Sequence, residues 1–472
     1  MNIEQIYTGC LAQGAYYIES KGEVAIIDPL REVRPYIDKA DAAGAKIKYI
    51  FETHFHADFV SGHVTLSERT GAPIIYGPTA NPGFEAIIAK DGQEFKLGEL
   101  TLIVLHTPGH TMESSTYLLK DKDGKDHALF TGDTLFLGDV GRPDLAQKAA
   151  HMTQEELAGT LYDSLRDKIM PLGDDIIIYP AHGAGSACGK NMMKETVDTL
   201  GNQKKVNYAL RADMTKGEFV KEVIAGLQPP PAYFPMNVKM NKKGYRDMEK
   251  IIAHGENALA PDAFEIAANH TGAVLLDARH QVDFARGHVP GSIFIGIDGD
   301  FAPWVGTLIK DVQQPILLIA EKQRIVEVLT RLSRVGFDNT IGYLDGGFKA
   351  WKKAGRHYDT VVSIPADELL QLKQDSEHPV PVFDVRKPGE FRSAHILDAQ
   401  NTPLSSINEH LNRFPEKEMF YIHCAGGYRS MIAASILKRR GIHNLIDIKG
   451  GFKAVKEAGI KTSGPICPAS LK

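Results

Sequence analysis

Short apolar runs, each followed by a turn rich in glycine or proline, recur along the first half of the chain. The run Ile47–Phe51 is typical of a buried strand, because β-prone residues dominate it and polar residues begin where it ends. Other segments have the apolar period of helices. We expect strands within 1–29 (with a hairpin), at 47–51 and 73–76, three within 92–131 and one at 176–179, and helices at 31–43, 60–69 and 153–169.

Three potential metal ligands follow the strand at 47–51. His54, His56 and Asp58 lie at a spacing of two, in a turn that can direct several side chains at one point. Imidazole nitrogen and carboxylate oxygen are both good ligands for borderline divalent metals. Such a set at a strand end is hard to explain by packing. The simpler alternative is two surface histidines beside a solvated aspartate.

Three later sites strengthen the metal interpretation. His110 in Thr-Pro-Gly-His-Thr, Asp133 in Phe-Thr-Gly-Asp-Thr and His182 in Tyr-Pro-Ala-His-Gly each follow an apolar run and a glycine or proline turn. Alone, each could be a satisfied core histidine or a turn aspartate. Together, four sets of ligands at strand ends in one half of the chain predict convergence at one face of the fold.

This series of motifs resembles the metallo-β-lactamase fold, an αββα sandwich, over residues 1–245. The usual motif of that family continues with a second histidine directly after the aspartate, and that histidine serves a second metal. Here the position is Phe59, whose ring cannot ligate a metal. The departure argues against thioester or lactam hydrolysis by a two-metal site, because both commonly use a metal-bound hydroxide.

A one-metal branch of the family, the persulfide dioxygenases, has a loop similar to residues 138–145, Gly-Asp-Val-Gly-Arg-Pro-Asp-Leu. The resemblance implies one Fe(II) per chain, held by His54, His110 and Asp133, with zinc possible in the purified protein. Two histidines and one carboxylate leave positions open for O2 and substrate, as in non-haem Fe(II) oxygenases. The remaining candidates would contact the substrate or orient the ligands; they are His56, Asp58 and His182.

Two more residues of this half are candidates for the site. Cys188 lies in a run of small residues just after His182, where the backbone can approach the metal closely; the alternative is a small buried core residue. Arg142 could hold an anionic group of the thiol carrier, since guanidinium pairs bidentately with carboxylate or phosphate. Its alternative role is a salt bridge within the loop.

An internal repeat occupies the second half, after an expected linker at 226–246. Leu-Asp-Ala-Arg279 is matched by Phe-Asp-Val-Arg386, and the Gly-Gly-Phe-Lys-Ala sequence at 346–350 is matched at 450–454. Each unit alternates strands with helices, which predicts two small α/β domains with parallel sheets. The predicted domains are 1–245, 246–360 and 361–472.

The second repeat unit contains a strand, a cysteine, a glycine-rich loop and a helix in that order, which resembles the rhodanese family. We expect loop N–H groups, the helix N-terminus and Arg429 to favour an anion at the Cys424 sulfur. The resulting thiolate would be a nucleophile toward sulfane sulfur; the alternative is a buried structural cysteine. The loop that would hold the persulfide consists of Ala425, Gly426, Gly427 and Tyr428.

The first repeat unit departs from this pattern. Aligned without gaps from the Gly-Gly-Phe motif, Ala320 lies opposite Cys424 and Ile325 lies opposite Arg429. The loop has no nucleophile and no glycine, and it carries an acidic residue, Glu321. We predict that this domain is inactive and serves as a spacer or interface.

Composition excludes several classes of function. Hydrophobic residues make up 43% and charged residues 24% of the 472 residues, which is ordinary for a soluble globular protein. The net charge of −5 gives no sign of nucleic-acid binding, no apolar run is long enough to cross a membrane, and no secretory signal is visible. Four scattered cysteines favour free thiols in a reducing cytoplasm over a disulfide framework.

The sequence therefore predicts a persulfide dioxygenase fused to a sulfurtransferase, acting in sulfide detoxification. A persulfide of glutathione, coenzyme A or a similar thiol would react with O2 to give sulfite. Sulfite would then take sulfur from Cys424 to form thiosulfate, or the reverse would occur. We expect a homo-oligomer. The alternatives are a glyoxalase-II-like zinc thioester hydrolase fused to a sulfurtransferase, and a non-catalytic persulfide sensor or relay scaffold.

Overall fold

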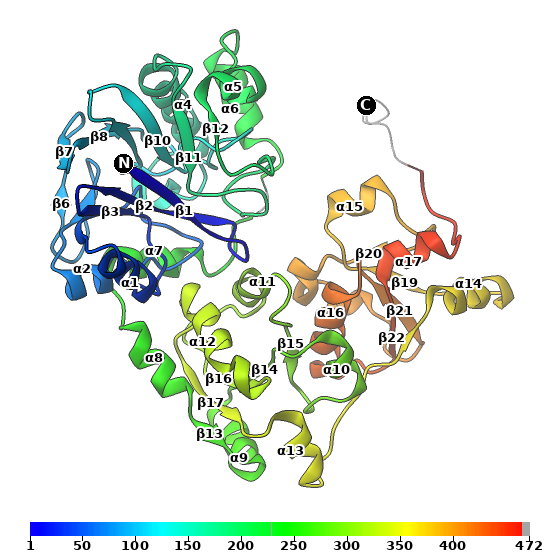
Figure 1. Ribbon diagram of the computed structural model, residues 1–472. Helices are drawn as coiled ribbons and strands as arrows, with labels where there is room; N and C mark the ends of the chain where they lie inside the picture. The colour runs from blue at the N-terminus through cyan, green and yellow to red at the C-terminus, as the bar shows by residue number, and fades with distance from the viewer. Residues whose placement is uncertain (228, 465–472) are drawn as a thin grey trace. The chain divides into compact units, whose positions relative to one another are not determined.

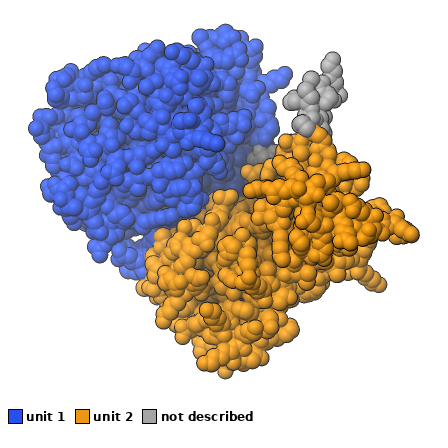
Figure 2. All heavy atoms as spheres, turned by 45° about the vertical axis from the view of Figure 1, so that its right-hand side comes forward, with its two compact units in different colours: residues 1–250, 332–337 blue, residues 251–331, 338–472 orange. Residues whose placement is uncertain are grey.

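The computed structural model describes residues 1–227 and 229–464 (Figure 1). The chain forms two compact units, coloured separately in Figure 2. The first comprises residues 1–250 together with 332–337, and the second comprises 251–331 and the chain from 338 onward. No helix of the described chain is long and apolar enough to cross a membrane.

Two six-stranded sheets form the centre of the first unit. The first sheet has the order β1 (Asn2–Thr8), β2 (Gln13–Ser20), β3 (Glu23–Ile27), β4 (Lys46–Phe51), β5 (Ile74–Tyr76), β6 (Ile87–Ile88). The second has the order β12 (Asp198–Thr199), β11 (Ile177–Pro180), β10 (Asp126–Gly132), β9 (Ser115–Lys120), β8 (Leu100–His106), β7 (Glu94–Leu97).

Alternating side chains of the strands separate the layers of this unit. Tyr16 and Ile18 of β2 belong to the core between the two sheets, whereas Ala15 and Tyr17 belong to a second core that includes Tyr36 of α1. Figure 1 shows helices on the outer side of each sheet. They are α1 (Arg34–Ala42), α2 (His63–Thr70) and α7 (Phe234–Lys243) at the first sheet, and α4 (Gln154–Ser164), α5 (Leu200–Val206) and α6 (Lys216–Ile224) at the second. The predicted αββα sandwich is confirmed.

Several predicted elements have different bounds. The helix expected at 60–69 begins only at His63, because residues 54–61 form the turn that carries the metal candidates. The region expected to hold three strands holds four, β7 to β10. The helix expected at 153–169 is α4 followed by a π-helical turn at Leu165–Ile169, and the Thr153 capping box with Glu156 is present.

The linker expected at 226–246 is wrong for much of its length. Helix α7 occupies Phe234–Lys243 and has Pro235 in its first turn, where a missing N–H costs nothing. Three of its side chains, Phe234, Asn237 and Asn241, are almost fully buried. Proline and lysine in this segment therefore mark a helix start and a solvated helix face, and the buried face packs into the first unit.

The second unit contains two five-stranded parallel sheets, as predicted. The first has the order β13 (Ala258–Leu259), β17 (Thr340–Leu344), β16 (Ile316–Ile319), β14 (Val274–Asp277), β15 (Ile293–Phe294). The second has the order β18 (Ser363–Ile364), β22 (Leu445–Ile448), β21 (Phe420–His423), β19 (Val382–Asp384), β20 (Gln400–Asn401).

Helices alternate with these strands in both halves of the second unit. The first half contains α9 (Pro261–Thr271), α10 (Gln281–Arg286), α11 (Phe301–Leu308), α12 (Ile325–Arg334) and α13 (Gly347–Lys353). The second half contains α14 (Ala366–Asp375), α15 (Pro388–Ser393), α16 (Tyr428–Arg439) and α17 (Gly451–Glu457). Each half has its own apolar core, one around Leu317 and Trp351 and the other around Leu369 and Val455.

Candidate metal centre and sulfur-transfer loop

Four loops of the first unit bring their histidine or aspartate together at the strand ends. His54 follows β4, His110 follows β8, Asp133 follows β10 and His182 follows β11, and each is about 1% exposed. The convergence predicted from four separate motifs is present in the structure. The parallel pairing of β10 with β11 places Asp133 and His182 at the same sheet edge.

Three of these side chains form a compact set of donors. Asp133 Oδ2 lies 3.4 Å from His110 Nε2 and 3.8 Å from His54 Nε2. Neither carboxylate oxygen of Asp133 has a hydrogen-bond partner among the described residues, although Asp133 is buried. A buried carboxylate without donors is costly unless a cation compensates it. His54, His110 and Asp133 therefore fit a bound metal ion.

Hydrogen bonds to the outer ring nitrogens orient both histidines. His110 Nδ1 lies 2.8 Å from the Arg142 carbonyl oxygen, so Nδ1 carries the proton and Nε2 is left for a metal. His54 Nδ1 lies 3.0 Å from Thr53 Oγ1, which in turn donates to Asp28 Oδ2 at 2.8 Å. Gly141 allows this arrangement, because a Cβ there would lie 2.1 Å from the Asp133 carbonyl oxygen.

Burial and neighbouring imidazoles keep His54 neutral. Desolvation lowers the pKa of His54 well below its usual value, and the neighbouring His56, His110 and His182 lower it further. A neutral imidazole presents a free lone pair, which is the form that ligates a metal.

A second group of donors lies beside the first. His182 Nε2 is 3.4 Å from Asp58 Oδ2 and 3.6 Å from Asp133 Oδ1. Cys188, which is 1% exposed, could join Asp133 and His182 around one ion. Burial, followed by the charges of Asp58 and Asp133, raises the pKa of the Cys188 thiol well above its usual value. The structure thus brings Cys188 next to Asp133 and His182.

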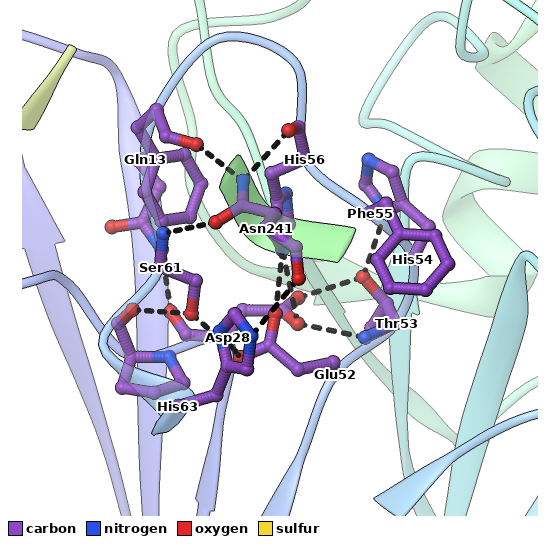
Figure 3. Close-up of polar contacts among 12 residues, drawn as sticks. Gln13, Asp28, Glu52, Thr53, His54, Phe55, His56, Ser61, His63 and Asn241 are labelled. Carbon is purple, nitrogen blue, oxygen red and sulfur yellow. Dashed lines mark hydrogen bonds and ion pairs between the residues drawn. The ribbon is translucent and has the colours of Figure 1, made fainter. Parts of the chain in front are cut away.

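His56 also faces a pair of carboxyl groups behind the centre (Figure 3). Its Nε2 lies 3.1 Å from Asp28 Oδ1 and 3.7 Å from Glu52 Oε2. Burial alone would lower the pKa of His56, but the adjacent Asp28 carboxylate and then Glu52 and Asp58 raise it to about 9. Burial, aided by Asp28, raises the pKa of Glu52 well above its usual value.

Phe59 is fully buried, and its ring packs against the His56 ring with centroids 4.4 Å apart. It therefore fills space beside the donors without supplying one.

Arg142, the other position singled out in this region, is 5% exposed and forms a bidentate pair with Asp144 at 2.7 and 2.8 Å. Its Nη1 also donates to the Ala187 carbonyl oxygen. This is the loop salt bridge that stood as the alternative to anion binding.

In the second unit, Cys424 lies at the end of β21 and is 1% exposed. The backbone N–H of Gly427 donates to Cys424 Sγ at 3.1 Å, and Gly427 has a φ of +103°, which a side chain would strain. On the other side, the N–H of Phe452 donates to the Cys424 carbonyl oxygen at 2.6 Å. The loop from Ala425 to Tyr428 thus directs an N–H group at the sulfur, and helix α16 begins at its last residue, Tyr428.

Two contacts hold the end of this loop. Arg429 forms a bidentate pair with Glu390 of α15 at 2.6 and 2.8 Å, a partner that the sequence did not reveal. The Tyr428 hydroxyl donates to the Gly296 carbonyl oxygen at 2.7 Å, and its ring lies so close to Gly299 that a Cβ there would meet it at 2.3 Å. In the other half of the unit, Ala320 stands at the end of β16 where Cys424 follows β21, so no thiol is present there.

The sequence model of the metallo-beta-lactamase superfamily matches residues 8–182, and the rhodanese-like domain model matches 261–354 and 365–458. A crystal structure of a metallo-beta-lactamase from Staphylococcus aureus subsp. aureus COL is 31% identical and has a TM-score of 0.64. The alignment covers 73% of this chain and 98% of that one.

The chain belongs to the metallo-beta-lactamase superfamily. Its second half carries two rhodanese-like domains, so the predicted fusion is confirmed. Among curated members of the superfamily, the human mitochondrial persulfide dioxygenase ETHE1 is 28% identical over 235 residues, which cover 47% of this chain and 79% of that protein. The hydroxyacylglutathione hydrolase GloC of Haemophilus influenzae is 29% identical over 213 residues, which cover 40% of this chain and 94% of that protein. The metallo-beta-lactamase and rhodanese-like domains indicate that the protein is an enzyme, and the metallo-beta-lactamase domain implies a bound metal ion.

Sequence reasoning missed the residues that support this superfamily's metal turn. Asp28 and Glu52 stand at the ends of strands β3 and β4, where the same rule of a polar residue after an apolar run could have found them. Asn241 and Glu390 gave no such signal, because each meets its partner across a long stretch of sequence. The described cysteines, Cys10, Cys188 and Cys424, are free thiols, as expected; Cys467 lies outside the described residues.

Proposed function

We propose that the first domain oxidises a low-molecular-weight thiol persulfide to sulfite, and that the last domain transfers sulfur through Cys424. The balanced oxidation is RSSH + O2 + H2O → RSH + SO3²⁻ + 2 H⁺. Its substrates would be the persulfides of glutathione, coenzyme A or a similar thiol. A reducing cytoplasm suits ferrous iron and free thiols, and we place this route of sulfide detoxification there.

His54, His110 and Asp133 would hold a single Fe(II). When bound, this ion would supply the activation of O2 that an organic side chain cannot provide. The protein contributes the orientation of the two imidazoles, through the Arg142 carbonyl and Thr53. It also contributes burial, which excludes water from the reacting atoms.

Phe59 is the observation that carries this proposal over a two-metal hydrolase. It occupies the position from which the related fold supplies a histidine to a second metal, and its ring is packed against His56. The second donor group is left with Asp58 and His182, which we assign to the persulfide. His182 can donate to the sulfur, and Cys188 lies close enough to Asp133 and His182 to contact it.

We assign Arg142 a role in holding its own loop, in place of a role in binding an anionic group of the substrate. Its guanidinium is engaged by Asp144 and Ala187, so binding an anion would require it to leave a buried bidentate pair. The backbone carbonyl of the same residue accepts from His110. Arg142 would therefore act by holding that carbonyl in place.

Sulfur transfer would proceed in two steps on Cys424. In the first, the thiolate attacks the outer sulfur of RSSH, which forms the Cys424 persulfide and releases RSH. In the second, sulfite attacks the outer sulfur of that persulfide, which releases thiosulfate and restores the thiolate. The Gly427 N–H would stabilise the thiolate, and Glu390 would hold the Arg429 guanidinium beside the loop. The other rhodanese-like domain would take no part, because Ala320 has no thiol.

A second candidate is a glyoxalase-II-like thioester hydrolase that uses zinc. Two observations favour it: the similarity to hydroxyacylglutathione hydrolases, and the donor group formed by Asp133, His182 and Cys188, which could hold a second ion. The two candidates differ in their need for O2.

Oxygen uptake by anaerobically iron-loaded protein, after addition of glutathione persulfide, tests the proposal. We expect stoichiometric uptake with formation of sulfite and thiosulfate. His110→Ala should abolish it, because one of three ligands is lost. His270→Ala, which removes a histidine of the other compact unit, is the control and should retain full uptake. Absence of uptake with this donor, with coenzyme A persulfide and with polysulfide would refute the dioxygenase and favour the hydrolase.

A further inference from the structure

One side chain from outside the four metal loops holds the turn that carries His56 and Asp58, two donors that lie beside the proposed metal ligands. Asn241 lies on α7 and is fully buried. Its Nδ2 donates to the backbone carbonyls of His56 and Phe59, each at 2.8 Å. Its Oδ1 accepts from the backbone N–H of Ser61 at 2.9 Å. Figure 3 shows the amide beside His56 and Ser61.

These contacts engage both N–H groups and the oxygen of the Asn241 amide, and all of them lie on one short stretch of backbone. A primary amide has two N–H donors and one carbonyl, and all three are engaged between positions 56 and 61. Asp58 lies within this stretch, and His56 is at its beginning. Loss of these bonds would free both side chains. It would also disturb the proposed metal ligand His54, whose ring packs on the His56 ring with centroids 4.2 Å apart.

A second layer of polar contacts supports the same turn. Ser61 Oγ donates to Glu52 Oε1 at 2.6 Å and lies 2.9 Å from the Pro29 carbonyl oxygen. His63 Nε2 lies 3.2 Å from the backbone carbonyl oxygen of Asn241. The turn is therefore attached to the end of β4 through Ser61 and Glu52, and to α7 through Asn241.

We propose that Asn241 is a positioning residue for the metal centre, which prearranges the turn 56–61 before a metal binds. Helix α7 thereby becomes a part of the site although it contributes no ligand. The proposal rests on a metal ion in this centre, as the proposed function does, and on no particular reaction there. Groups that orient metal ligands commonly change metal affinity by roughly 10- to 100-fold when removed.

The test measures binding of Co(II) to the metal-free full chain under anaerobic conditions. We expect Asn241→Ala and Asn241→Asp to raise the Kd for Co(II) by roughly 10- to 100-fold and to change the visible absorption spectrum of the bound ion. The aspartate has the size of the asparagine but presents an oxygen to the two carbonyls. A Kd and spectrum equal to those of the wild type, in folded variants, would overturn the proposal.

Asn237→Ala is the matched control. Asn237 lies one turn earlier on α7 and is also fully buried, but its amide has no hydrogen-bond partner within the described chain. We expect an unchanged Kd and spectrum, even if the melting temperature falls. An equal loss of Co(II) affinity in both variants would show a purely structural effect of the helix and would refute the positioning role.

Hydrogen exchange of the wild type keeps the test independent of how the variants fold. The Ser61 amide should be protected from exchange in the metal-free protein, since its acceptor is Asn241 Oδ1 and not a metal ligand. Rapid exchange of that amide would mean that no prearranged turn exists. If the wild type bound no Co(II) at all, the metal centre itself would be refuted, which is a different result from a centre that is indifferent to Asn241.

Discussion

A single aromatic residue, Phe59, separates the two chemistries that the metal centre could support. Its neighbours Asp58 and His182 are donors that lie 3.4 Å apart, and a further donor at position 59 would complete a second site. The phenyl ring instead packs on His56 and is fully buried. At the scale of one residue, we expect the number of metal ions to depend on whether this side chain carries a nitrogen.

Phe59→His is therefore expected to raise the amount of metal bound per chain. The imidazole adds a nitrogen donor next to Asp58, whereas Phe59→Leu removes the ring without adding one. Both variants would be saturated with zinc, desalted and analysed for metal content by emission spectroscopy. A wild type that already holds two ions, or a histidine variant that binds no more than the leucine variant, would contradict the role given to Phe59.

Strand β22 carries a buried carboxyl group that destabilises the fold when it ionises, and the sequence does not show this burial. Asp447 in β22 is 3% exposed, and its Oδ1 has no hydrogen-bond partner within the described chain. Burial raises the pKa of Asp447 from 3.8 to about 6. The folded state therefore binds this proton more tightly than the unfolded state. The contribution of Asp447 to the stability of the fold therefore falls as the pH rises from 4 through 6, and this loss is complete above that range.

Asp447→Asn should stabilise the last domain at pH 7.5 by about 2 kcal/mol, and by much less at pH 4. The amide cannot ionise, and it can still accept from the Ser363 hydroxyl, which lies 3.3 Å away. Thermal unfolding at both pH values measures the effect. Asp375→Asn at the exposed end of α14 is the control and should show no such pH dependence. A stabilisation equal at both pH values would argue against a buried ionised carboxylate.

At the scale of the whole molecule, the metal donors and Cys424 belong to separate compact units. The metal donors lie in the first unit, and Cys424 lies in the second, which has its own sheets and cores. The second unit also holds its two halves together near the Cys424 loop, through the Tyr428 contact with Gly296 and the bond from the Phe294 N–H to Ser435 Oγ. The half without a thiol therefore contacts the half with one.

Cys424→Ala should leave O2 uptake intact and cause sulfite to accumulate in place of thiosulfate. The substitution removes the sulfur acceptor in one unit and alters no donor in the other. Oxygen uptake, sulfite and thiosulfate would be assayed in the same reaction, with Cys10→Ala as a control that retains both products. Loss of O2 uptake in the Cys424 variant, or thiosulfate formation at the wild-type rate, would contradict this division of labour.

The sequence by itself determined the ligand types, their order after strand ends, the departure at Phe59 and the repeat with its one cysteine loop. These features are local: hydrophobic periodicity predicts the strands, and a polar residue after each strand predicts the edge where ligands meet. The αββα sandwich and the two parallel sheets followed from the same patterns and the family resemblance. The positions of Cys188 near the centre and of Arg142 in its loop stayed open between alternatives.

Only the tertiary structure decided which groups support the ligands. Asn241 meets the metal turn from a segment that its proline and lysine content had assigned to a linker, and Asp28 meets His56 from the end of β3. Glu390 meets Arg429 from another helix. Side-chain partners of this kind depend on distances between elements that are remote in sequence, and local periodicity contains no information about those distances.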